Sequence, residues 1–112
     1  MDIQPEIGHY PERRKKPRYQ CDYPANIQGF ELNGEFFQIE GRVVNLSRNG
    51  VNIRLNREIP DGMEISIKIA FPTGLLDLGT TNLAVHGKVV RSENLSETIC
   101  GIAVKFQDFR FI

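Results

Sequence analysis

Hydrophobic and polar residues alternate along most of the chain with a period of two, which is the pattern of half-buried β-strands. The alternation is clearest from Ile65 to Phe71, where isoleucines alternate with Ser66, Lys68 and Ala70. No segment has a convincing helical periodicity. The pattern predicts an all-β domain with six strands, over residues 23–30, 36–45, 51–56, 65–71, 81–91 and 98–106.

Turn-forming residues separate the predicted strands. The Asn-Gly pair at 33–34 predicts a hairpin, because both central residues of a type I′ turn need a positive φ. Turns are also predicted at 60–62 and 72–74, and residues 75–79 are read as a loop or a short helical turn. Gly41 predicts a bulge or bend inside the second strand. Short strands with such turns fit a small closed antiparallel barrel, since closure removes exposed sheet edges.

A barrel with so few strands fills its interior with its own side chains. We therefore expect any ligand to bind outside, on loops and on an outer face.

The chain has 112 residues, which fits one small domain. It has no apolar run of the roughly 18 residues that a membrane helix needs, and its start lacks the features of a signal peptide, so we expect a cytoplasmic protein without membrane insertion. Cys21 and Cys100 have neither metal spacing nor a secretory context, and we interpret them as reduced thiols. The 14 basic and 14 acidic residues cancel, and no broadly basic surface for DNA is expected.

Catalytic chemistry has few candidates in this sequence. His9 and His86 are the two histidines, and no Cys/His cluster has metal-ligand spacing. No glycine-rich phosphate loop is present, and the carboxylates are scattered singly. We therefore expect neither an enzyme nor a metal site nor a cofactor.

Positive charge is concentrated in one short stretch before the first strand. Residues 1–18 hold five basic and three acidic residues, and the five basic ones all lie in residues 13–18. Arg14 and Arg18 have the spacing Arg-x-x-x-Arg, and Pro17 stiffens the segment between them. Guanidinium groups bind phosphate bidentately and stack on planar rings, so two of them can clamp a base and its phosphate. A solubilising basic tail is the alternative for such a run taken alone.

A second polar motif lies between the second and third predicted strands. Asn45 and Ser47 are two residues apart, so the amide and the hydroxyl point the same way and can read the edge of a purine. Gly50 would allow a left-handed backbone or the close approach of a ligand. The alternative is an ordinary turn, since Asn, Ser and Gly are turn formers.

Together and in this order, Arg14…Arg18 and Asn45…Ser47…Gly50 resemble the PilZ domain family, the bacterial receptor module for cyclic di-GMP. That family has Arg-x-x-x-Arg before its first strand and Asp/Asn-x-Ser-x-x-Gly between its second and third strands. The segments 51–55, 87–91 and 101–106 also resemble its strands, so the likeness covers residues 13–106.

The resemblance implies a PilZ domain over residues 13–112, with a flexible tail at 1–12 and a flexible N-terminal arm on a six-stranded antiparallel split barrel. It implies a cyclic di-GMP receptor or adaptor that regulates a partner protein, an effector that the sequence does not identify. The arm would fold onto the barrel when the ligand binds. Arg13, as a third guanidinium, would favour an intercalated pair of ligands. The implied ligand-binding residues are Arg13, Arg14, Arg18, Asn45, Ser47 and Gly50.

Two features depart from the family's usual pattern. Asn45 stands where Asp is commoner, which keeps an acceptor and adds a donor. Residues 107–112 are too short for a stable independent helix after the last strand, so little or no C-terminal helix is expected.

Two other functions remain open at this point. One is a PilZ-fold interaction module that does not bind the nucleotide, although such a module would be expected to lose an arginine or the serine. The other is a small barrel that binds single-stranded nucleic acid, which needs outer aromatic residues and a basic groove. The chain has no Trp.

Overall fold

The computed structural model describes residues 19–72 and 80–112, and these residues form an all-β fold. The predictions for Arg13, Arg14, Arg18 and the tail, for the turn at 72–74 beyond Pro72, and for residues 75–79 fall outside this part of the chain. Six strands are present: β1 (Tyr19–Phe30), β2 (Phe36–Leu46), β3 (Gly50–Leu55), β4 (Glu64–Pro72), β5 (Thr80–Asn94) and β6 (Cys100–Phe111).

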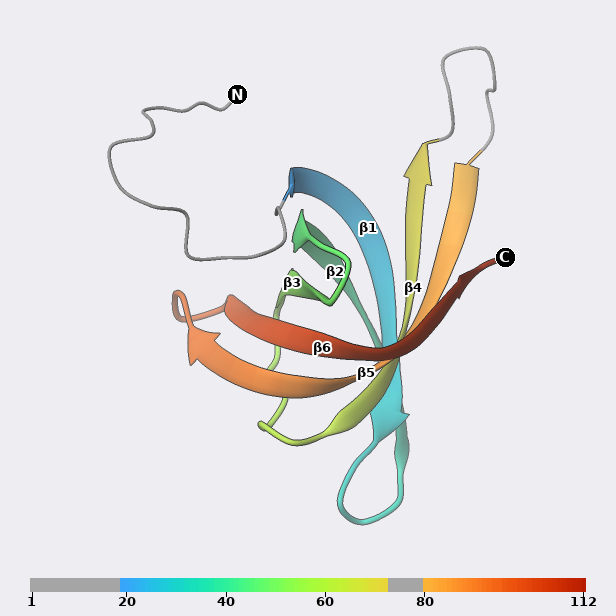
Figure 1. The fold of residues 1–112 in the computed structure, drawn as a ribbon. Helices are drawn as coiled ribbons and strands as arrows, with labels where there is room; N and C mark the ends of the chain where they lie inside the picture. The colour runs from blue at the N-terminus through green and yellow to red at the C-terminus, as the bar shows by residue number, and fades with distance from the viewer. Residues whose placement is uncertain (1–18, 73–79) are drawn as a thin grey trace.

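The strands close into an antiparallel barrel in the order β1-β2-β3-β6-β5-β4 (Figure 1). The predicted all-β barrel is therefore confirmed. Three strands run well beyond their predicted bounds: β1 begins at Tyr19, four residues early, β5 continues to Asn94, and β6 continues to Phe111. Residues 107–111 extend β6 alongside β5, and the described residues contain no helix.

Inward-facing aliphatic side chains fill the barrel. Alternate residues of neighbouring strands contribute to this core, and the described residues include no buried polar or charged side chain. Burying each large aliphatic side chain stabilises the fold by about 1.5–3 kcal/mol relative to leaving it exposed. The largest fully buried side chains are Ile27, Ile53, Ile59, Ile65, Ile69, Val43 and Val89. With the interior filled, the outer face and the loops are left for binding.

The β1–β2 hairpin forms as predicted, but its turn differs from the predicted type. The Gly34 N–H donates to the Glu31 carbonyl over 2.9 Å, which puts Leu32 and Asn33 at the centre of the turn. Gly34 follows them with a φ of 88°. This is a three-residue loop that ends in a left-handed glycine, and not the two-residue type I′ turn. The Glu35 N–H is held by the Asn33 side chain at 2.9 Å.

The predicted bulge at Gly41 is wrong. Gly41 stays in register between Ala25 and Leu55 on the neighbouring strands. A Cβ there would lie 2.7 Å from the Arg54 carbonyl oxygen, so the glycine permits close packing instead of a bulge. The irregularity in β2 comes later, between Val43 and Asn45.

Candidate functional site

The connection between β2 and β3 is a tight polar turn that carries the Asn-x-Ser-x-x-Gly motif. The Ser47 N–H donates to the Gly50 carbonyl over 3.0 Å, and the Ser47 hydroxyl lies 3.3 Å from the same oxygen. The Asn49 N–H in turn donates to the Ser47 Oγ over 3.3 Å. Because its proton is directed to Gly50, the Ser47 hydroxyl has one lone pair left with which to accept a bond from a ligand.

The irregularity in β2 decides where the Asn45 side chain points. Asn45 pairs with Asn52, which lies between the inward-facing Val51 and Ile53 of β3. Directly opposed residues share a face of the sheet, so Asn45 faces outward with Asn52. Without the extra residue at Val44, alternation from buried Val43 would turn Asn45 inward. The bulge therefore presents the amide on the outer surface, and no other side chain of the described residues hydrogen-bonds to it.

Gly50 has a close neighbour within the protein itself. A Cβ at Gly50 would lie 2.4 Å from the Val104 carbonyl oxygen of β6, closer than real Cβ atoms come. Gly50 pairs with Lys105 in the β3–β6 ladder. In the described residues the glycines with positive φ are Gly34 and Gly62, so a left-handed backbone at Gly50 is not found. The glycine is needed for the close approach of β6 to the end of the turn.

These three motif residues line one shallow groove of about 250 Å³ on the outer face of the barrel. Asn52 and Asn49 add amides to it, and Val90 adds an apolar surface that is 53% exposed. Lys105 supplies an ammonium group, and no carboxylate of the described residues lines the groove. Amides, a hydroxyl, an apolar patch and one cation suit a ligand that combines a polar planar base with an anionic group.

Sequence reasoning missed Asn52, Val90 and Lys105. Their outward positions follow from alternation within each strand, but their proximity to Asn45 depends on which strands are neighbours. That order comes from the closure of the barrel, in which β3 is placed beside β6 and β6 beside β5.

The start of β1 connects the basic segment to this turn. Tyr19 pairs with Leu46, and Gln20 pairs with Asn45. Arg18 is the residue before Tyr19, and consecutive Cα atoms are about 3.8 Å apart. Arg13, Arg14 and Arg18 themselves lie outside the described residues. The chain nevertheless enters the barrel beside the second motif.

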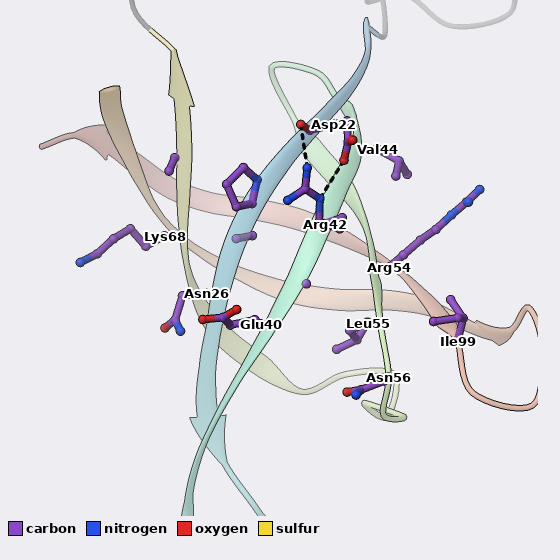
Figure 2. Close-up of a pocket in the computed structure, with 14 residues that line it drawn as sticks. Asp22, Asn26, Glu40, Arg42, Val44, Arg54, Leu55, Asn56, Lys68 and Ile99 are labelled. Carbon is purple, nitrogen blue, oxygen red and sulfur yellow. Dashed lines mark hydrogen bonds and ion pairs between the residues drawn. The ribbon is translucent and has the colours of Figure 1, made fainter. Parts of the chain in front are cut away.

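A larger groove of about 820 Å³ lies on the outer face of β4, β1, β2 and β3 (Figure 2). Arg42 donates to Asp22 over 2.8 Å within it, and this hydrogen bond, with the charge of Arg42, lowers the pKa of the Asp22 carboxyl. Val44 and Arg54 also line an intermediate groove, of about 130 Å³, that includes Asn45. The motif groove is therefore one end of a surface that continues around the barrel.

The described residues contain no group of three or more His, Cys, Asp and Glu that could hold a metal ion. His86 faces outward, as predicted, with its Nε2 atom 3.3 Å from a Glu64 oxygen. Both cysteines are free. In the part of the chain searched, no helix is long and apolar enough to cross a membrane.

Comparison with known proteins gives one family and several related structures. A family model described as the PilZ domain matches residues 12–111. The structure of the Bacillus subtilis inhibitor of motility, MotI/DgrA, superposes with a TM-score of 0.71 at 16% identity, covering 96% of this chain and 49% of that one. This chain thus spans about half the length of that protein.

Two further similar structures were solved with a ligand. The PilZ domain of Escherichia coli YcgR with c-di-GMP has a TM-score of 0.56 and 15% identity, covering 87% of this chain and 79% of that one. The K. pneumonia MrkH–c-di-GMP complex has a TM-score of 0.58 and 16% identity, covering 87% and 45%. At such identities these likenesses show the shared fold. None of the curated proteins compared matches the chain by sequence.

Proposed function

The chain belongs to the PilZ domain family, and from this premise we propose that it is a receptor for cyclic di-GMP. The observation that carries the proposal is the outward-facing turn. Asn45, Ser47 and Gly50 line one groove, and β1 starts beside them, one residue after Arg18. The similar structures of YcgR and MrkH, which were solved with c-di-GMP, also support cyclic di-GMP as the ligand.

Each motif residue has a distinct part in the proposed complex. Arg14 and Arg18 bind phosphate and stack on guanine, which a guanidinium can do and an ammonium cannot. Asn45 donates and accepts hydrogen bonds at the base edge, and Ser47 accepts one with its remaining lone pair. Gly50 keeps the turn closed against β6. Arg13 adds a third guanidinium, which favours an intercalated pair of ligands with four phosphates.

The proposed output is a change in the surface that the protein presents. The phosphates neutralise the charges of residues 13–18, which otherwise repel one another, and the arm folds onto the outer face beside Asn45. A partner protein then meets a different surface. On this proposal the protein is a cytoplasmic binding module of a bacterium and not an enzyme.

The two other functions make different predictions. A PilZ-fold interaction module that does not bind the nucleotide would not need both sequence motifs. Here the arginine motif and the Asn-x-Ser-x-x-Gly motif are both complete, which favours the receptor. A barrel for single-stranded nucleic acid would need stacking aromatics on its outer face. The motif groove has none among its described lining residues, and its apolar member is Val90.

Calorimetric titration with cyclic di-GMP tests the proposal directly. We expect Arg14→Ala and Arg18→Ala to weaken binding by about 1.5–3 kcal/mol, more than tenfold, because a charge-assisted contact is lost. Lys15→Ala, between them, is the matched control and should have a much smaller effect. Wild-type affinity in both arginine variants would refute the assignment. Binding of an oligonucleotide but not of cyclic di-GMP would favour the nucleic-acid barrel.

A further inference from the structure

The last part of β6 has a neighbouring strand on one side. β3 pairs with β6 only as far as Lys105, and the Phe106 N–H donates to the Asn49 carbonyl over 2.7 Å. From Asp108 onward, β6 pairs within the described residues with β5 alone. Figure 1 shows this end of β6, in dark red, leading away from the barrel to the C-terminus.

The hydrogen-bond pattern shows which backbone groups face away from β5. The Ile112 N–H donates to the Asn82 carbonyl over 2.9 Å, and the pairing remains in register back to Asp108 opposite His86. Hydrogen-bonded and non-bonded pairs alternate in an antiparallel ladder. Asp108 and Arg110 therefore direct their backbone groups to β5, whereas the N–H and C=O of Phe109 point outward. An unpaired edge of this kind is a template for another strand.

The sequence of this edge is complementary to itself. If two copies pair antiparallel about Phe109, each Phe109 lies opposite its counterpart and the two exchange both of their backbone hydrogen bonds. Asp108 of each copy then lies opposite Arg110 of the other, in the pairs whose side chains come closest. Neither Asp108 nor Arg110 has an ion-pair partner among the described residues.

Apolar exposure at the same place gives the pairing a second source of stability. Phe109 lies on the same face of the sheet as Val85, which is buried, yet the Phe109 side chain is 48% exposed. Its ring packs on Phe106 at a centroid distance of 5.6 Å. Self-pairing would bring two such rings together across the two-fold axis, where aromatic cross-strand pairs are favourable.

We propose that a second copy of this chain binds to the edge of β6 at residues 108–110, by antiparallel pairing about Phe109. The two barrels then share a continuous sheet across a two-fold axis. The paired segment is short, so the interface belongs with the weak contacts that bury less than about 1,200 Å² in total. This dimer needs no ligand and is independent of the proposed cyclic di-GMP site.

Sedimentation velocity of the 112-residue chain from about 10 μM to about 1 mM tests the proposal. The wild type should shift from monomer toward dimer over this range, and less at high salt. Asp108→Arg places like charges in both cross-copy pairs, so association should fall about tenfold or more. The swap Asp108→Arg with Arg110→Asp restores opposite charges and should restore association.

The backbone part of the proposal has its own pair of variants. Phe109→Pro removes an N–H that points away from β5, so the β5–β6 ladder is kept but dimerisation is lost. Phe109→Ala is the matched control: it loses the same ring but keeps the N–H, so it should retain measurable association. Urea unfolding of both variants checks that they fold. A wild type that stays monomeric near 1 mM overturns the proposal. The edge of β6 would then be available for an extended segment of another protein. Association that the charge reversal and the proline leave unchanged also overturns it.

Discussion

At the scale of single residues, the motif of the β2–β3 turn combines residues that hold the turn together with residues that are free to bind. Gly50 and Ser47 are both needed inside the protein. The Val104 carbonyl leaves no room for a Cβ at Gly50, and the Ser47 hydroxyl donates a hydrogen bond to the Gly50 carbonyl. The Asn45 side chain, in contrast, has no hydrogen-bond partner among the described residues. Substitutions at these positions should therefore affect stability and binding in different proportions.

Gly50→Ala should destabilise the fold by about 1–3 kcal/mol, because the new methyl group meets backbone that cannot move without disturbing β6. Gly101→Ala on β6 is a matched control. Its Cβ would meet flexible side chains instead of backbone, with the end of Leu95 at 3.2 Å and Glu93 at 3.9 Å, and its cost should stay within about 0.5 kcal/mol. Urea unfolding of both variants measures the difference. Equal stabilities would show that β6 tolerates a side chain at Gly50.

Asn45→Ala and Ser47→Ala separate ligand contact from turn stability. Each should weaken cyclic di-GMP binding by about 0.5–1.5 kcal/mol, roughly 2- to 12-fold, as expected for a neutral hydrogen bond. Ser47→Ala should also lower the free energy of unfolding by about 1 kcal/mol, because the Asn49 N–H and the Gly50 carbonyl lose a partner. Asn45→Ala should leave unfolding unchanged. Calorimetry and urea unfolding of the two variants decide; a stability loss confined to Asn45→Ala would reverse these roles.

At the scale of elements, the strands could be predicted from alternation, but their irregularities could not. The run from Ile65 to Phe71 shows its pattern within its own sequence. The bulge at Val44 depends instead on how β2 is aligned with β3, and the sequence of β2 alone does not determine that alignment. The bulge predicted at Gly41 is wrong for the same reason, since the Arg54 carbonyl that requires a glycine belongs to a different strand.

The β1–β2 hairpin is fastened to the segment after β3 by one arginine. Arg57 donates to the two Glu31 oxygens over 2.9 and 3.2 Å, and its guanidinium lies 4.4 Å from the centroid of the Phe37 ring. The hydrogen bonds, with the charge of Arg57, lower the pKa of Glu31 from its usual value of 4.5. A lowered folded-state pKa stabilises the protein above the unfolded value, and that contribution is lost as the pH falls through the folded value.

Glu31→Gln should therefore reduce stability most near neutral pH. Its difference from the wild type should shrink as the pH falls below about 4.5, because the Glu31 carboxyl of the unfolded chain is protonated first and that of the folded wild type only at its lower pKa. Glu35→Gln is the control in the same hairpin, because the Glu35 carboxylate has no ion pair among the described residues. Urea unfolding across this pH range measures both variants. A pH-independent difference for Glu31→Gln would argue against the ionised pair as the source of the stability.

The proposed movement of the arm can be tested by proteolysis. Trypsin cleaves after the basic residues of segment 13–18, except before Pro17. If cyclic di-GMP folds this segment onto the barrel, the ligand should slow cleavage there by about tenfold or more, since an ordered segment must open before it is cut. In Arg14→Ala the ligand should give little protection. Mass spectrometry of timed digests locates the cuts, and cleavage unaffected by saturating ligand would exclude the closure.

At the scale of the whole molecule, closure of the barrel explains why the site could be predicted only in part. Asn45, Ser47 and Gly50 are near one another in sequence, so their motif was visible in the chain. Asn52 and Lys105 enter the same groove only because β2, β3 and β6 are consecutive in the closed order. The filled interior also confines binding to the outer surface, where a ligand remains open to solvent on one side unless another part of the chain covers it.

Because the groove lies on the outer surface, no barrel wall encloses its ligand, and we propose that Arg13 favours the binding of two ligand molecules as an intercalated pair. One cyclic di-GMP carries two phosphates, and an intercalated pair carries four that repel one another. Three guanidiniums at positions 13, 14 and 18 would offset this repulsion and cap the outer guanine face by stacking. Calorimetry under tight-binding conditions should give a ligand-to-protein ratio near two. Arg13→Leu should lower the ratio toward one while keeping some binding, whereas Lys15→Ala should leave it near two. A wild-type ratio near one would show that Arg13 contributes only long-range attraction, which salt screens over about 10 Å at 0.1 M.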